Sequence, residues 1–132
     1  MLVFLSLPST GISQEIRDSQ NRLLYRGSAD GRISTSQNVL LWKFDESGKV
    51  FSVQNVLILQ LKPDGKVISS SNKLLGRIDA DGTVWDSMNK KLGKVTKEGR
   101  VVDLSNRLLA KGTKIPTKRC GLLWFFLHTT TE

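Results

Sequence analysis

The chain has 132 residues, 39% of them hydrophobic, and a formal net charge of +8 at pH 7. This length corresponds to one domain with a modest continuous core. The single cysteine, Cys120, excludes an intrachain disulfide and a cysteine-based zinc site. Lysines and arginines are spread along the chain, which is typical of a solvated face and leaves weak affinity for polyanions as the functional alternative.

Residues 1–13 carry no charge and precede a repeat that begins at Gln14 or Glu15. An apolar stretch that ends in small residues before a polar start resembles the latter half of a secretory signal, with cleavage after Ser13. The alternative is an extra strand. At this length and without a basic leading region, the segment is not predicted to span a membrane. We favour the signal and expect an exported protein that is periplasmic, cell-surface or secreted.

Residues 14–115 repeat with a period of 17 residues. Asparagine recurs in one register and glycine in a second, and these two residues enter the left-handed backbone region at least cost. Each unit is predicted to form two short strands and two turns, and to depend on its neighbours for burial. The predicted turn residues are Asn21, Asn38, Asn55, Asn72, Asn89 and Asn106, with Gly31, Gly48, Gly65, Gly82 and Gly99.

Side-chain alternation predicts the strand register. Ile78 and Val84 share the core face if the glycine turn is a three-residue loop ending at Gly82. Val84 is then expected to face Leu92 across the asparagine turn, and Trp85 to face Lys91. The predicted inward set is Ile16, Ile33, Val50, Val67, Val84 and Val101, with Leu24, Leu41, Ile58, Leu75, Leu92 and Leu109.

An odd spacing from Leu75 to Ile78 requires a bulge or bend, for which Gly76 and Gly93 are placed. The same position holds Tyr25, Trp42 and Leu59 in the earlier copies, where the bend is less clearly predicted. Where an acid begins the asparagine turn, a base is predicted opposite, and where Thr35 or Ser52 replaces the acid a valine is opposite. These predicted pairs are Asp18 with Arg22, Asp86 with Lys90, Asp103 with Arg107, Thr35 with Val39 and Ser52 with Val56.

Residues 116–132 break the period with an apolar run from Gly121 to His128. Eight residues are too few to span a bilayer. We predict a buried closing strand that covers an open edge of the repeat, because exposed apolar edges aggregate. The alternative is a tail docked on a partner or a membrane surface.

The unit Ile-x-Asp-x-x-Asn-x-x-Leu-Gly-x-Val-x-x-Asp-Gly-x-Val and the tail Ala-Lys-Gly…Ile-Pro…Trp-Phe-Phe resemble the exported "five-fold β-flower" proteins of Bacteroidetes over residues 14–128. The resemblance implies an exported, propeller-like ring of short β-hairpins about a pseudo-five-fold axis. It implies no activity, because none is established for that family. The predicted fold is therefore all-β, with about six hairpin units in a closed or nearly closed ring.

No pattern in the chain predicts catalysis, a cofactor or a metal. The only histidine, His128, lies in the apolar tail, and no spacing marks a carboxylate pair. Asp79-Ala80-Asp81-Gly82 resembles a fragment of a calcium loop, but such a site needs six or more ligands, and turn chemistry already explains these residues. We predict that the protein is not an enzyme.

Trp85 is predicted to point outward because Val84 points inward. With Arg77 and Lys91 as basic neighbours it forms the candidate ligand site, since an aromatic face can stack on a sugar ring. The alternative is that Trp85 merely packs on Lys91. Nucleic acid is not predicted as a partner, because no recognition motif is present and export argues against it.

Two functions follow as hypotheses. The first is an exported structural or protein-interaction module that presents a rigid β-surface to another exported protein. The second is a binding module for glycan or acidic envelope polymer. Charge-driven polymer binding is expected to weaken steeply with salt, whereas a packed protein interface is not.

Overall fold

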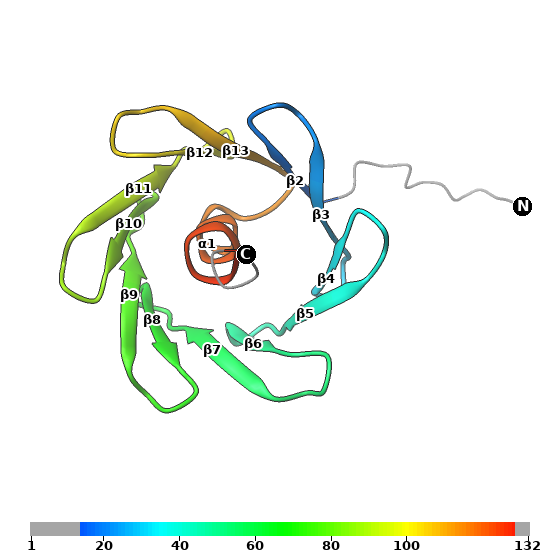
Figure 1. The fold of residues 1–132 in the computed structure, drawn as a ribbon. Coiled ribbons are helices and arrows are strands. Elements are labelled where there is room, and N and C mark those ends of the chain that lie inside the picture. The colour runs from blue at the N-terminus through cyan, green and yellow to red at the C-terminus, as the bar shows by residue number, and fades with distance from the viewer. Residues whose placement is uncertain (1–13, 129–132) are drawn as a thin grey trace, which may run out of the picture.

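The computed structural model describes residues 14–128, in which twelve antiparallel strands close into a ring around a central helical segment (Figure 1). The strands are β2 (Gln14–Asp18), β3 (Leu23–Gly27), β4 (Arg32–Thr35), β5 (Leu40–Phe44), β6 (Lys49–Phe51), β7 (Leu57–Leu61), β8 (Lys66–Ser69), β9 (Leu74–Ile78), β10 (Thr83–Asp86), β11 (Lys91–Val95), β12 (Arg100–Val102) and β13 (Leu108–Thr113). The central segment is α1 (Thr117–Gly121) followed by η2 (Leu122–Leu127).

The ring is closed by its two terminal strands. β13 pairs with β2, with Ala110 opposite Asp18 and Thr113 opposite Glu15. This pairing leaves no open sheet edge. The predicted all-β closed ring is confirmed, whereas the five-fold arrangement and the 17-residue structural unit stay predictions. The expected leader, residues 1–13, and the end of the tail, residues 129–132, lie outside the described residues.

Every predicted turn residue has a positive φ, from 66° to 68° at the six asparagines and from 86° to 96° at the five glycines. The loop at Gly82 matches its prediction, because the Asp79 amide donates to the Thr83 carbonyl at 2.8 Å and the Gly82 amide donates to the Asp79 carbonyl at 3.0 Å. A Cβ on Gly82 would overlap the Val95 carbonyl oxygen. The glycine is therefore required both by its φ and by the neighbouring strand.

An oxygen acceptor begins each asparagine turn. Asp18 Oδ1 accepts the Gln20 and Arg22 amides, both at 2.9 Å. The Thr35 hydroxyl accepts the two equivalent amides at 3.2 Å, so threonine and serine replace aspartate without loss of the turn. The Arg22 amide is the main cause that lowers the pKa of Asp18 below its usual range. The threonine and serine that replace aspartate in the middle copies therefore leave the asparagine turns regular.

The predicted acid–base pairs are present in part. Arg22 Nε lies 2.9 Å from Asp18 Oδ2, and Arg107 Nε lies 3.2 Å from Asp103 Oδ2. Lys90 reaches Asp86 through its backbone, since its amide donates to Asp86 Oδ1 at 2.9 Å. Charge pairing therefore supplements a turn that backbone hydrogen bonds already define.

Each hairpin contains a β-bulge, and because of it half of the predicted core is wrong. Ile78 faces Val84 as predicted, but Val84 faces Gly93 rather than Leu92, and Trp85 faces Lys91. Leu92 is the extra residue of the bulge, so the next residue points inward instead. The first predicted inward set is buried as expected, whereas the second set, Leu24, Leu41, Ile58, Leu75, Leu92 and Leu109, is only half-buried.

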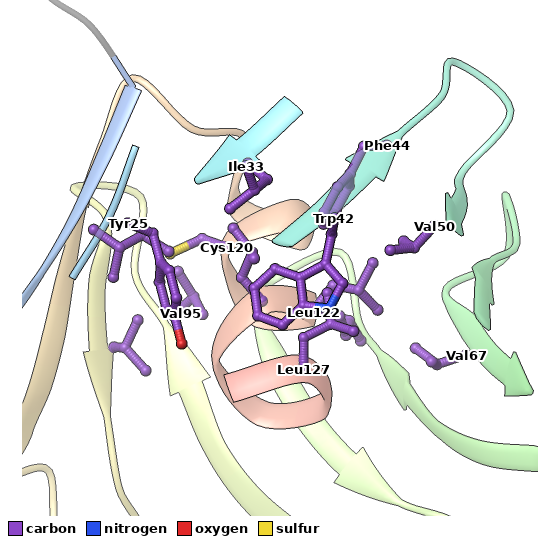
Figure 2. Close-up of a cluster of buried hydrophobic side chains, with 14 of the residues drawn as sticks. Tyr25, Ile33, Trp42, Phe44, Val50, Val67, Val95, Cys120, Leu122 and Leu127 are labelled. Carbon is purple, nitrogen blue, oxygen red and sulfur yellow. The ribbon is translucent and has the colours of Figure 1, made fainter. Parts of the chain in front are cut away.

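The C-terminal segment is helical, which corrects the predicted closing strand. Because β13 already closes the ring, no edge is left to pair with, and a segment inside an apolar ring must satisfy its own backbone groups. Figure 2 shows Cys120, Leu122 and Leu127 of this segment among inward side chains of the ring. Cys120, Leu122, Leu123 and Leu127 are at most 1% exposed.

The side chains that line the inside of the ring are large on one side of the ring and small on the other. The residue after each bulge is Tyr25, Trp42 or Leu59 in the first three hairpins and Gly76, Gly93 or Ala110 in the last three. A Cβ on Gly93 would lie 2.7 Å from Phe125 Cζ, and one on Gly76 would lie 2.8 Å from Phe126 Cζ. Aromatic rings of η2 therefore fill the space over the glycines, while Tyr25 and Trp42 fill the other side.

Cys120 is expected to be inert to thiol reagents in the folded protein. It is fully buried, and burial raises the pKa of its thiol to about 12, so the reactive thiolate is scarce. We expect alkylation at pH 8 to be slow without denaturant and fast in denaturant, as followed by mass spectrometry. Rapid labelling of the native protein would contradict the central placement of this segment.

Candidate functional site

The predicted site residues lie on one outward row that crosses four strands. Lys66 of β8 faces Arg77 of β9, Arg77 faces Trp85 of β10, and Trp85 faces Lys91 of β11. Direct cross-strand partners point to the same side of a sheet, so the four side chains share the outer face. The structure therefore brings the predicted three together and adds Lys66.

Trp85 is held in place by its neighbours. The Arg77 Cζ atom lies 4.7 Å from the centroid of the indole ring, within the range of a cation–π contact. Trp85 Nε1 donates to Asp79 Oδ2 at 2.7 Å, and Arg77 Nε lies 3.1 Å from Asp79 Oδ1. Trp85 points outward as predicted but is half-buried rather than fully exposed. The indole is a fixed platform whose orientation is set by two polar contacts.

A shallow cavity of about 200 Å³ opens beside this row. Lys66 and Arg77 line it, together with Ser87 and Asn89 of the asparagine turn. The Arg77 Nη1 group donates to the Asn89 side-chain oxygen. Cations, an amide and a hydroxyl are the groups that bind hydroxyl and acidic groups of a ligand. The remaining lining residues are Leu74, Gly76 and Asp86.

Lys66 was missed in the sequence because of the bulge. Without a bulge, Val67 faces Leu75 and Lys66 faces Gly76, whereas the bulge at Leu75 moves Lys66 opposite Arg77. The odd spacing from Leu75 to Ile78 was the available signal. A correct placement of that bulge would have added Lys66 to the site.

The other chemical candidates are structural. His128 Nδ1 lies 2.6 Å from Tyr25 Oη, and its ring stacks on Trp124 at 4.2 Å between centroids. The Asp79 carboxylate holds Trp85 and Arg77, and Asp81 Oδ1 accepts the Thr83 amide at 3.0 Å. Across residues 14–128, no group of histidine, cysteine and acidic side chains is arranged to hold a metal ion.

A larger cavity, about 380 Å³, lies at the glycine-turn end of the ring. It is bounded by two turns, residues 45–48 and 61–63, and by Arg119 of α1. The Arg119 Cζ atom lies 5.1 Å from the centroid of the Phe44 ring. Sequence reasoning missed this cavity because it expected a strand where α1 lies.

Comparison with protein-family models, curated proteins and solved structures finds no match to this chain. In the part of the chain that the structure describes, no helix is both long enough and apolar enough to cross a membrane. The function is therefore argued from the geometry of the outer face.

Proposed function

We propose that this protein is a non-enzymatic binding module that holds a glycan or acidic envelope polymer on its outer strand face. The observation that carries the proposal is the single row of Lys66, Arg77, Trp85 and Lys91 beside a cavity that Lys66 and Arg77 line. A fixed indole offers a surface to a sugar ring, and the flanking cations offer partners to its acidic groups.

The charge arrangement on this row favours an acidic ligand. Lys66 and Arg77 stand directly opposite each other, and like charges in that position destabilise a strand pair. Asp79 lies 3.1 Å from Arg77 and Asp64 lies 3.9 Å from Lys66, so the turns neutralise part of this charge. Both acids are at least a third exposed, and exposed ion pairs contribute little. A bound anion offsets the remaining repulsion.

A protein-interaction role is the second candidate, and a separate surface supports it. Val39 is 57% exposed on the turn that joins β4 and β5, and Val53 and Val56 are 43% and 61% exposed on the next asparagine turn. Apolar side chains on neighbouring turns are typical of a contact with another protein. In this role the ring is a rigid structural module, and its partner is another exported protein.

The finer architecture is part of the proposal. We propose that the hairpins are copies of one 17-residue unit arranged as in the exported β-flower proteins of Bacteroidetes, and that the chain is exported. The regular spacing of asparagine and glycine and the character of residues 1–13 support this. Mass spectrometry of the protein from its native cells, with the cleavage position and cell fraction recorded, tests export.

Trp85→Ala is expected to weaken polymer binding about tenfold, which corresponds to about 1.4 kcal/mol and lies within the range for stacking on an aromatic platform. The measurement is titration of the full chain with polygalacturonate and with its methyl ester, which keeps the sugar backbone but lacks the charge. Met88→Ala is the control, since Met88 is 85% exposed on the adjacent turn.

Equal affinity of Trp85→Ala and the unchanged protein would contradict this placement of the site. No binding of either polymer at low salt would contradict polymer binding itself and leave the protein-interaction role as the better proposal.

A further inference from the structure

The basic pair Lys66–Arg77 belongs to a series that encircles the ring. Each hairpin carries one cross-strand pair between its bulge and its glycine turns on the outer side of the sheet, and every member except the buried Thr83 is at least partly exposed. The six pairs are Glu15–Arg26, Arg32–Lys43, Lys49–Gln60, Lys66–Arg77, Thr83–Lys94 and Arg100–Lys111. We call these residues the basic belt. Nine of its members are lysine or arginine and only Glu15 is acidic.

The ring is closed, so the pairs recur around the whole circumference, and the belt steps by two residues from one hairpin to the next, where Arg26 faces Ser34 rather than Arg32. Every pair occupies the same position in its hairpin, and successive hairpins follow one another around the central helix (Figure 1). Neighbouring strands lie about 4.8 Å apart, so the two side chains of a pair leave the sheet side by side. The cations therefore form a track around the circumference rather than one isolated patch.

Among residues 14–128, acids of the glycine turns offset part of this charge, since Asp45 interacts with Lys49 and Asp81 with Lys94. Arg32 lies 3.7 Å from Asp30, and Lys66 and Arg77 have the two contacts given above. Arg100 and Lys111 face each other with no ion pair, and both are exposed. At the asparagine turns the same chain places an acid beside a base, as at Asp18 and Arg22. The glycine turns compensate the belt only in part, and the Arg100–Lys111 pair points to a ligand that supplies further negative charge.

Apolar side chains adjoin the belt on the asparagine-turn side. Lys43 faces Phe51, Arg77 faces Trp85, and Lys94 faces Val102 on the next hairpin. Arg26 and Lys111 instead face the polar Ser34 and Arg17, and Val102 is only 6% exposed. A ligand that follows the belt therefore meets apolar surface beside its cations at Phe51 and Trp85. This favours a chain of sugar rings with acidic substituents, whose ring faces are apolar and whose edges are charged.

We propose that one linear anionic polysaccharide runs along the basic belt and contacts several hairpins at once. This inference rests on the proposed function and extends it from one row to the whole circumference. Each hairpin supplies a weak exposed contact, and affinity arises because a long polymer engages several of them together. Binding is therefore expected to depend on polymer length and on salt.

Length dependence is the first test, measured with the full chain. The probes are polygalacturonate oligomers too short to leave one hairpin and polymers long enough to pass several. We expect at least about tenfold tighter binding per chain for the long polymer at low salt, and a large loss at high salt. A short oligomer that binds as tightly as the long polymer would overturn the belt while leaving a local site at Trp85 intact.

Paired substitutions are the second test. Arg32→Gln with Lys43→Gln, and Arg100→Gln with Lys111→Gln, each remove one belt pair far from Trp85. We expect each double variant to bind the long polymer roughly threefold to tenfold more weakly, with a shallower salt dependence. Lys73→Gln with Lys90→Gln is the control, because it removes the same charge from exposed asparagine turns.

The outcomes separate the two proposals. Losses in both belt variants but not in the control support the belt. Loss only on changing Lys66, Arg77 or Trp85 overturns the belt and keeps the proposed function, and no binding of any polymer overturns both. Tighter binding of single-stranded RNA than of polygalacturonate of equal charge would overturn the choice of polysaccharide.

Discussion

Trp42→Ala is expected to lower the free energy of unfolding by about 3–5 kcal/mol, the range for removing a large buried aromatic residue. Trp42 is 5% exposed and packs against Tyr25 at 5.5 Å between ring centroids. Figure 2 shows the Trp42 ring beside Leu122 and Leu127 of the central segment. The best-conserved copies within the chain have glycine at this position, so repeat regularity alone predicts that a small residue is acceptable here.

Trp85→Ala is the matched comparison, because it removes the same side chain from the outer face. We expect this substitution to lower the free energy of unfolding by about 1 kcal/mol, because it removes the cation–π contact and the hydrogen bond. Urea denaturation of both variants measures the difference. If both substitutions lowered the free energy of unfolding equally, the packing of the central segment would not depend on Trp42.

Gly82→Ala is expected to cost about 3 kcal/mol or to prevent folding. Its φ is +93°, and a Cβ there would overlap the Val95 carbonyl oxygen of the next hairpin. The strands cannot separate freely, because the Val95 amide donates to the Gly82 carbonyl at 2.9 Å. The measurement is the urea midpoint together with the circular dichroism spectrum.

Asn89→Gly is the control for the turn conformation itself. Asn89 has a φ of 66°, which glycine adopts without strain, so we expect a change within about 0.5 kcal/mol. A large loss in this variant would mean that the asparagine side chain is needed, and a tolerated Gly82→Ala would mean that the neighbouring strand moves easily.

The filled interior determines where a ligand can bind. Leu122, Leu123 and Leu127 occupy the middle of the ring, so the surfaces left for ligands are the outer strand face, the asparagine turns and the turn ends of the ring. Each hairpin repeats the same outer positions. In the function we propose, affinity arises from one weak contact used many times rather than from one deep pocket.

The candidate site was partly predictable. Trp85, Arg77 and Lys91 were assigned from alternation along the strands, which holds on either side of each bulge. Lys66 and the basic belt were not found, because their pairing depends on the bulge at Leu75 and its equivalents. A bulge changes the partner of every residue beyond it, so an error of one residue removes a whole row.

The amino-acid sequence by itself determined the turns and the first half of the core. Asparagine and glycine have local conformational preferences, and Val50, Val67 and their equivalents alternate within single strands, so neither depends on distant residues. Only the tertiary structure decided that the tail is helical and that Tyr25 and Trp42 oppose Gly76 and Gly93. Those features arise because the closed ring leaves no strand edge for the tail and encloses one space, which side chains from opposite walls and from η2 must fill together.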